Sequence, residues 1–193
     1  MAKFAIMGFG TVGGGVAEVL RLNGGAIAEK LGEPLSLQYI LDLRDLSETP
    51  YADKAVKDFS ILENDPELEL VVEAIGGAKA ALEFTRRALL AGKHVVTSNK
   101  ELVAAHGREL LAIAREKNVS YLFEASVGGG IPVLRPLSQC LSGNRVQEIV
   151  GILNGTTNYI LTRMVQDGVS FDEARKEAQA KGSAKQNPAA DVK

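Results

Sequence analysis

The chain has 193 residues, 46% of them hydrophobic and 24% charged, which is enough for one substantial core and a second, smaller lobe. Its formal net charge of -2 excludes the broad basic field that draws proteins to nucleic acid. The apolar start, MAKFAIMGFG, is too short and reaches glycines too soon to be a signal peptide or a membrane span. We therefore expect a globular cytoplasmic protein whose partners include neither nucleic acid nor a membrane.

Cysteine and histidine are scarce. Cys140 is the only cysteine, which excludes an intrachain disulfide and a cysteine-based zinc cluster, and we expect it to pack in the core. His94 and His106 have no partner at metal-ligand spacing, so we interpret both as structural or solvated residues.

Short apolar runs alternate with longer helical patterns through the first two thirds of the chain. Strands are predicted over residues 3–7, 35–41, 70–74, 94–97 and 119–124, and helices over residues 12–21, 80–91 and 101–117. Gly92 is a plausible left-handed cap for the second of these helices. This alternation predicts an α/β fold, a doubly wound parallel Rossmann sheet with helices on both faces.

The pattern changes after Glu124. A triple glycine at 128–130 is followed by Pro132 near a predicted helix start and by a strand-like run over 146–153. We place the boundary here, with residues 1–125 forming an NAD(P)-binding domain and residues 126–193 a partial α+β substrate-binding and dimerisation domain. Ser170 begins a capping-box pattern that predicts a last helix closing at Gly182.

A glycine-rich loop directly follows the first predicted strand and opens the first helix. Its residues are Gly8, Phe9, Gly10, Thr11, Val12 and Gly13. In this context the glycines permit a tight turn, close approach of a pyrophosphate and close packing of helix on sheet. The helix amino terminus adds unpaired N–H groups and partial positive charge. The loop therefore predicts dinucleotide binding.

Signals for the type of dinucleotide conflict. Asp42 follows the second predicted strand, where a carboxylate accepts from the ribose hydroxyls of NAD. Arg44 could instead pair with the 2′-phosphate of NADP, which a facing carboxylate would repel. Either charge could also be a solvated loop residue. The segment 23–34 reads as an insertion that lengthens the usual spacing to Asp42, so both cofactors stay open.

Four further motifs go beyond a general Rossmann pattern. They occupy residues 71–77, 96–100, 123–132 and 151–159 and read VVEAIGG, VTSNK, FEASVGGGIP and GILNGTTNY. With these motifs in this order, nearly the whole chain closely resembles homoserine dehydrogenase. The resemblance implies interconversion of L-homoserine and L-aspartate 4-semialdehyde by hydride transfer with NAD or NADP, in the biosynthesis of threonine, methionine and isoleucine, and a homodimer paired through the second domain.

Site residues are implied at matching positions. Lys100 follows a predicted strand at the carboxyl edge of the sheet, where its ammonium could bond the reacting oxygen or relay its proton, although a lysine here is otherwise an ordinary surface charge. The resemblance also places Gly76, Ser98 and Lys100 beside the cofactor. Glu73, at the end of an apolar strand, could orient Lys100 or serve local hydrogen bonding, and the sequence does not choose between these.

The resemblance implies two further sites. A monovalent cation, typically sodium, would be bound through one carboxylate and backbone carbonyls, at the positions Glu124, Val127, Gly129 and Ile131. The competing interpretation of this segment is a flexible domain hinge. Thr156 matches a substrate-side position that could donate to a carboxylate, and its competing interpretation is a simple helix cap.

The last residues depart from the family pattern. Lys185 stands where the family has a glutamate that would meet the amino group of homoserine, and this reverses a charge. A distal Asp and Lys of the family have no counterpart within 193 residues. Strands and helices that would cover the second domain are also absent, so we expect exposed apolar side chains or a dimer interface at Val146, Ile149, Ile152 and Ile160.

Three hypotheses follow. The first is a homoserine dehydrogenase in which NAD(P) binds at the glycine loop and Lys100 serves proton transfer. The second is a catalytically impaired, dinucleotide-binding remnant of that family, suggested by Lys185 and the missing pair. The third, another amino-acid or sugar dehydrogenase with the same cofactor fold, is disfavoured by the Asn-Gly-Thr-Thr-Asn run at 154–158.

Overall fold

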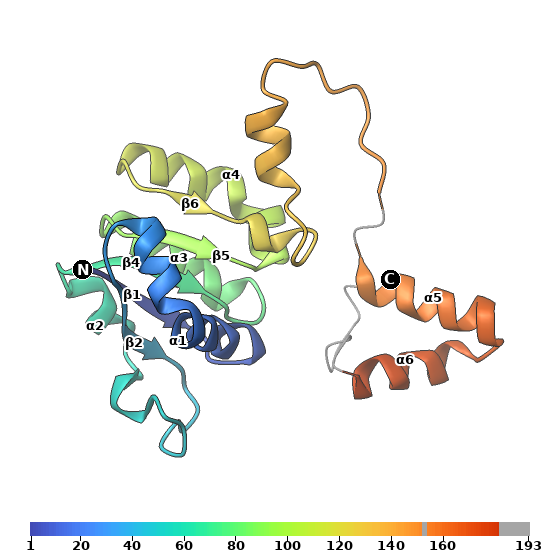
Figure 1. Ribbon diagram of the computed structural model, residues 1–193, viewed down its shortest axis with the longest axis horizontal. Coiled ribbons are helices and arrows are strands. Elements are labelled where there is room, and N and C mark those ends of the chain that lie inside the picture. Colours follow the sequence, from blue (N-terminus) through green and yellow to red (C-terminus); the bar gives the residue numbers. More distant parts are fainter. Residues whose placement is uncertain (152–153, 182–193) are drawn as a thin grey trace. The chain divides into compact units, whose positions relative to one another are not determined.

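A computed structural model describes residues 1–151 and 154–181 (Figure 1). The chain divides into two compact units, the first spanning Met1–Leu134 and the second beginning at Arg135. Residues 126–134, predicted to belong to the second domain, therefore pack with the first unit. In the described part of the chain, no helix is both long enough and apolar enough to cross a membrane.

Six parallel strands form one sheet in the first unit, in the order β3-β2-β1-β4-β5-β6. This confirms the predicted α/β Rossmann class, because the strand order reverses between β1 and β4 as in a doubly wound sheet. The strand bounds are Ala2–Met7 for β1, Leu35–Leu41 for β2, Ala55–Val56 for β3, Leu68–Glu73 for β4, His94–Thr97 for β5 and Tyr121–Leu122 for β6.

Helices cover both faces of this sheet. Their bounds are Thr11–Leu31 for α1, Phe59–Asn64 for α2, Lys79–Leu90 for α3 and Lys100–Glu116 for α4. Alternate residues of β1 enter different cores: Phe4 and Ile6 pack with Ala17 of α1, whereas Ala5 and Met7 join the core shared with α3 and α4. Strand β1 is thus buried on both sides, which explains its continuous apolar run.

Helix α1 is longer than predicted. Its predicted end at residue 21 was wrong, because the helix continues through Gly24 and Gly25 to Leu31, where Gly32 closes it at a φ of 85°. The residues interpreted as an insertion therefore belong largely to the helix. Among the added turns, Ile27 lines an apolar cavity together with Phe4 of β1 and with Leu70 and Val72 of β4, an apolar environment that favours the helix despite the low helix propensity of glycine.

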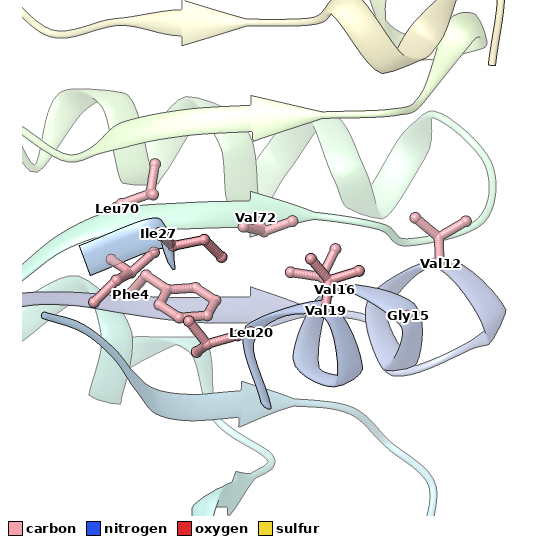
Figure 2. Close-up of a pocket in the computed structure, with 10 residues that line it drawn as sticks. Phe4, Val12, Gly15, Val16, Val19, Leu20, Ile27, Leu70 and Val72 are labelled. Atoms are coloured by element: carbon pink, nitrogen blue, oxygen red, sulfur yellow. The ribbon is translucent and has the colours of Figure 1, made fainter. Parts of the chain in front are cut away.

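The same face holds an apolar cavity of about 400 Å³, shown in Figure 2. Phe4, Leu70 and Val72 project from β1 and β4 toward Val16 and Leu20 of α1. No lining side chain of this cavity carries a polar group. It therefore offers nothing for binding a phosphate or moving a proton.

The second unit contains a helical hairpin, with α5 spanning Gly155–Asp167 and α6 spanning Phe171–Ala180. Ile160 packs on Ala174 and Ala178 and is buried, so its predicted exposure was wrong. Val146 and Ile149 are 48% and 63% exposed, as predicted.

Three local predictions can be compared with the second unit. The Ser170 capping box is confirmed, because the Ser170 hydroxyl accepts from the Glu173 N–H while the Glu173 carboxylate accepts from the Ser170 N–H. The strand predicted over 146–153 was wrong for residues 146–151, which pair with no strand in the described part, while 152–153 lie outside the described residues. Cys140 is exposed, so its predicted place in the core was wrong; it is the last residue of the π-helical segment Pro136–Cys140, none of whose residues is buried.

Candidate functional site

The glycine loop links the end of β1 to the start of α1, and two of its glycines are required by close backbone contacts. Gly8 has a φ of +89°, and a Cβ there would lie 2.8 Å from the Ala74 oxygen. A Cβ on Gly13 would lie 2.0 Å from the Gly8 oxygen. Gly10, by contrast, faces open space and is the N-cap of α1 without a side-chain cap bond. The amino-terminal N–H groups of α1 are thus left for a ligand anion.

Asp42, just after β2, anchors this loop. Its Oδ2 accepts from the Phe9 N–H at 2.7 Å, and both carboxylate oxygens accept from the Arg44 guanidinium, at 3.0 and 2.7 Å. The hydrogen bonds from Arg44, helped by the backbone N–H groups of Arg44 and Phe9, hold the pKa of Asp42 well below its ordinary value. The two residues that pointed to different cofactors are therefore paired with each other. Arg44 remains 61% exposed and can turn toward a ligand.

A cavity of about 440 Å³ opens at this edge of the sheet. It is lined by Gly8, Gly10, Leu41, Asp42, Leu43, Arg44, Lys57, Ala74, Ile75, Gly76, Ala80 and Phe84. It lies at the carboxyl ends of β1, β2 and β4, around the point where the strand order reverses, where open α/β sheets bind nucleotides. We refer to it as the nucleotide pocket.

Four of the predicted cofactor residues line the nucleotide pocket: Gly8, Gly10, Arg44 and Gly76. Among the others, Phe9, Thr11 and Gly13 shape the loop and the first turn of α1, and Val12 lines the apolar cavity of Figure 2. Ser98 lies on the β5–α4 loop and Lys100 begins α4, and neither belongs to the lining set.

Lys57 is a lining residue that sequence reasoning missed. Its ammonium donates to the carbonyls of Leu43 at 2.7 Å and Arg44 at 3.0 Å, so it closes the loop after β2. It follows β3, a two-residue strand with no recognisable apolar run. Only the pairing of β3 with β2 brings this cation to the pocket.

Lys100 directly follows the β5–α4 loop; it is exposed and is the first residue of α4. Asn99 precedes it as the N-cap, accepting from the Leu102 N–H at 3.1 Å. The Asn99 amide also donates to the carbonyls of Ile75, at 3.2 Å, and Gly77, at 2.8 Å. Asn99 therefore ties the Lys100 loop to the loop that lines the nucleotide pocket, a role that its place in the sequence did not reveal.

Glu73 and Thr97 form a buried pair beneath these loops. They are direct neighbours in the β4–β5 ladder, and the Thr97 hydroxyl donates to Glu73 Oε2. Glu73 Oε1 accepts from the Ile75 N–H at 2.7 Å. Both bonds are local, as one of the two interpretations of Glu73 expected. His94, elsewhere on β5, accepts from the Ser120 N–H, which supports its structural interpretation.

The predicted cation segment curls tightly. Gly128 and Gly129 have φ values of +75° and +60°, and a Cβ on Gly128 would lie 2.7 Å from the Ile131 oxygen. Glu124 Oε1 accepts from the N–H groups of Val133 and Leu134, at 2.5 and 3.0 Å. Within the described ranges no three His, Cys, Asp or Glu side chains gather to hold a metal, so a cation here would depend on backbone carbonyls such as those of Val127, Gly129 and Ile131.

The substrate-side predictions fall in the second unit. Thr156 is the second residue of α5 and is half-buried. The cap of that helix is Asn154, whose side chain accepts from the Thr157 N–H at 3.0 Å, so Thr156 is not itself the N-cap. Lys185 lies outside the described residues.

Known proteins resemble this chain over nearly its whole length. A family model described as "Homoserine dehydrogenase, NAD binding domain" matches residues 8–124, more than half of the chain, and one described as "Homoserine dehydrogenase" matches residues 132–193. A homoserine dehydrogenase of Pseudomonas aeruginosa is 43% identical over 195 residues, covering 98% of this chain and 44% of its own length.

Solved structures of homoserine dehydrogenases are also similar to this chain. The homoserine dehydrogenase of Thiobacillus denitrificans is 40% identical with a TM-score of 0.90, covering 99% of this chain and 45% of that one. A hyperthermophilic archaeal homoserine dehydrogenase in complex with NADPH is 27% identical with a TM-score of 0.81, covering 99% of this chain and 64% of that one. The chain thus spans less than half the length of the first two relatives.

Proposed function

The chain belongs to the homoserine dehydrogenase family, and we propose that it serves the NAD(P)-dependent interconversion of L-homoserine and L-aspartate 4-semialdehyde. The observation that carries the proposal is the connection of two loops: the β4–α3 loop, which lines the nucleotide pocket, is bonded through Asn99 to the loop that presents Lys100. A cofactor pocket and a proton-donating ammonium at one sheet edge suit hydride transfer coupled to proton transfer.

The pocket fits a dinucleotide. The open space at Gly10 lets a pyrophosphate approach the uncapped amino terminus of α1. Arg44 and Lys57, which follow the carboxyl ends of β2 and β3, supply positive charge to the pocket. Asp42 could accept from ribose hydroxyls if Arg44 turned away, and Arg44 could meet a 2′-phosphate. NAD and NADP therefore remain joint candidates.

In the proposed reaction the nicotinamide, when bound, supplies the hydride to the aldehyde carbon or takes it from the alcohol carbon. Lys100 is the residue proposed to act on the oxygen: its ammonium donates a proton as the aldehyde becomes an alcohol and recovers it in reverse. Thr156 is proposed to donate to the substrate carboxylate. Lys185 is the position where a glutamate would have met the substrate amine.

We further propose that residues 1–125 are the NAD(P)-binding domain and 126–193 part of the substrate and dimerisation domain. The curled segment holding Glu124, Val127, Gly129 and Ile131 fits a monovalent cation such as sodium, since its glycines allow carbonyls to converge. Exposed Val146 and Ile149 support a homodimer, which light scattering would test. We place the protein in the cytoplasm, in the biosynthesis of threonine, methionine and isoleucine.

The test separates binding from turnover. Calorimetric titration with NADPH and NADH measures binding, and loss of NAD(P)H absorbance with aspartate semialdehyde measures turnover. Lys79→Ala is the matched control for Lys100→Ala, because both lysines are exposed first residues of consecutive helices. We expect turnover that survives in Lys79→Ala and is lost in Lys100→Ala, with binding retained in both.

Each other outcome is informative. Equal turnover in the two variants would remove Lys100 from the mechanism. Binding without turnover by this chain would favour the impaired, dinucleotide-binding remnant. Absence of binding to either cofactor would refute the proposed function.

A further inference from the structure

Glu73 is an unusual residue to bury at the edge of a cofactor site. Its side chain is 0% exposed at the end of β4, between Met7 of β1 and Thr97 of β5 in the sheet. Burying a carboxylate is costly unless hydrogen bonds satisfy it. Within the described part of the chain, Glu73 is held by hydrogen bonds to Ile75 and Thr97 and makes no ion pair.

The hydrogen bonds of Glu73 reach two loops. The Thr97 hydroxyl accepts from the Asn99 N–H at 2.9 Å and donates its own proton to Glu73 Oε2. Glu73 Oε1 accepts from the Ile75 N–H. One carboxylate therefore sets the backbone of the β4–α3 loop with one oxygen and, through a threonine hydroxyl, the backbone of the β5–α4 loop with the other.

Asn99 makes a second connection between the two loops. Its backbone is set by Thr97, and its side-chain amide donates to the carbonyls of Ile75 and Gly77 on the β4–α3 loop. Lys100 is the next residue, at the first position of α4. The loop that lines the nucleotide pocket and the loop that precedes Lys100 are thus joined twice, once through the Glu73–Thr97 hydrogen bond and once through the Asn99 side chain.

We propose that Glu73 is a positioning residue that acts through Thr97 and Asn99 to fix the spacing between the nucleotide pocket and Lys100. This rests on the proposed function, in which the cofactor and Lys100 act on one substrate. Burial raises the pKa of Glu73 above its ordinary value, and its hydrogen bonds to Thr97, Ile75 and Asn99 oppose that rise.

A matched pair of threonines tests the proposal. Thr97→Val removes the linking hydroxyl at nearly constant volume. Thr85→Val does the same in α3, where the buried Thr85 hydroxyl has no hydrogen-bond partner among the described residues. Thr97→Ser keeps the hydroxyl, and Glu73→Gln keeps an acceptor for Ile75 but faces Thr97 with an N–H donor in place of an acceptor.

We expect kcat for aspartate semialdehyde reduction to fall by about tenfold or more in Thr97→Val and Glu73→Gln, because a shift of about 1 Å in a catalytic group can cost on the order of a hundredfold. KM for the reduced cofactor should change much less. Thr97→Ser should restore kcat, and Thr85→Val should leave it unchanged. Equal kcat in Thr97→Val and Thr85→Val, or a loss confined to cofactor KM, would overturn the proposal.

A second readout does not need turnover. Amide hydrogen exchange, followed by mass spectrometry, should rise together in peptides covering residues 74–78 and 98–101 in Thr97→Val, and in neither peptide in Thr85→Val. If the unaltered chain binds cofactor but does not turn over, this measurement alone decides: exchange that rises in only one loop refutes the coupling. If Thr97→Val does not fold, Glu73→Gln and Thr97→Ser give the same comparison.

Discussion

The glycine loop allows one prediction to be worked in detail, because its neighbouring glycines have different reasons to lack a side chain. A Cβ on Gly13 would lie 2.0 Å from the Gly8 oxygen and 3.0 Å from Ile6 Cγ2, whereas a Cβ on Gly14, the next residue of α1, would meet nothing within 4 Å. Gly14→Ala is therefore the matched control. Both variants gain helix propensity, and only Gly13→Ala creates a clash.

The clash cannot be relieved cheaply. The Gly8 oxygen is backbone, the Gly8 N–H donates to the Leu41 carbonyl at 2.8 Å, and Gly8 already lies tightly against Ala74. Overpacking costs about 1–3 kcal/mol, and a rigid backbone contact this short belongs at the upper end. We expect Gly13→Ala to be about 3 kcal/mol less stable than Gly14→Ala, or roughly 6–12 °C in melting temperature for a chain of this size.

Gly10→Ala is the third variant of this experiment. The Gly10 φ of -76° suits alanine, and a Cβ there would point into open space. The free energy of unfolding of Gly10→Ala should therefore lie within about 0.5 kcal/mol of that of the unaltered chain. Affinity for NAD(P) should nevertheless fall about tenfold or more, since the methyl group would occupy the path of the pyrophosphate.

Urea denaturation and calorimetric titration of the three variants measure both effects. A Gly13→Ala variant as stable as Gly14→Ala would refute the packing argument. Cofactor affinity equal in Gly10→Ala and Gly14→Ala would refute the assignment of the phosphate path.

Three further predictions concern charges and caps. Because Arg44 lowers the pKa of Asp42, this carboxylate stabilises the fold above about pH 4, and the stabilisation is lost as the pH falls toward the folded-state pKa. In the unaltered chain the free energy of unfolding should therefore decline between about pH 4 and 2. Urea titration should show a smaller decline in Asp42→Asn. Lys93→Met should cost about 1–3 kcal/mol, because the buried Lys93 ammonium donates to the carbonyls of Asp65 and Leu68, and an unchanged urea midpoint would contradict this. Ser170→Ala should lower the stability of the α5–α6 hairpin by about 0.5–2 kcal/mol through loss of the capping box, and thermal melting followed by circular dichroism would detect it.

The sheet could be predicted from sequence wherever an apolar run was buried on both sides. The bounds of β2 and β5 are as predicted, and β1 and β4 differ by one or two residues. The two-residue strand β3 and the short helix α2 carry no periodicity long enough to detect. The run at 146–151 resembles a strand in composition but has no partner in the described part, and composition cannot supply a ladder.

The sequence predicted which positions belong to the site, but it did not predict the hydrogen bonds that join them. The fingerprint located Gly8 and Gly13, since the φ of +89° at Gly8 and the contact of Gly13 with the Gly8 oxygen both arise within the loop itself. The Asp42–Arg44 pair could not be inferred, because the same two residues fit either cofactor until the loop geometry joins them. Asn99 was missed because its contacts depend on the register of β4 with β5.

One arrangement recurs around the carboxyl edge of the sheet: a carboxylate at the end of a strand, or one or two residues after it, accepts hydrogen bonds from the backbone N–H groups of a nearby loop. Asp42 holds Phe9, Glu73 holds Ile75, and Glu124 holds Val133 and Leu134. The acceptors are carboxylates, which bind N–H groups more strongly than neutral oxygens do. Loops fixed in this way do not pay the ordering cost when a ligand arrives. Weakening any one of these carboxylates should therefore reduce affinity or turnover before it unfolds the sheet, because the cores beneath them are formed by other residues.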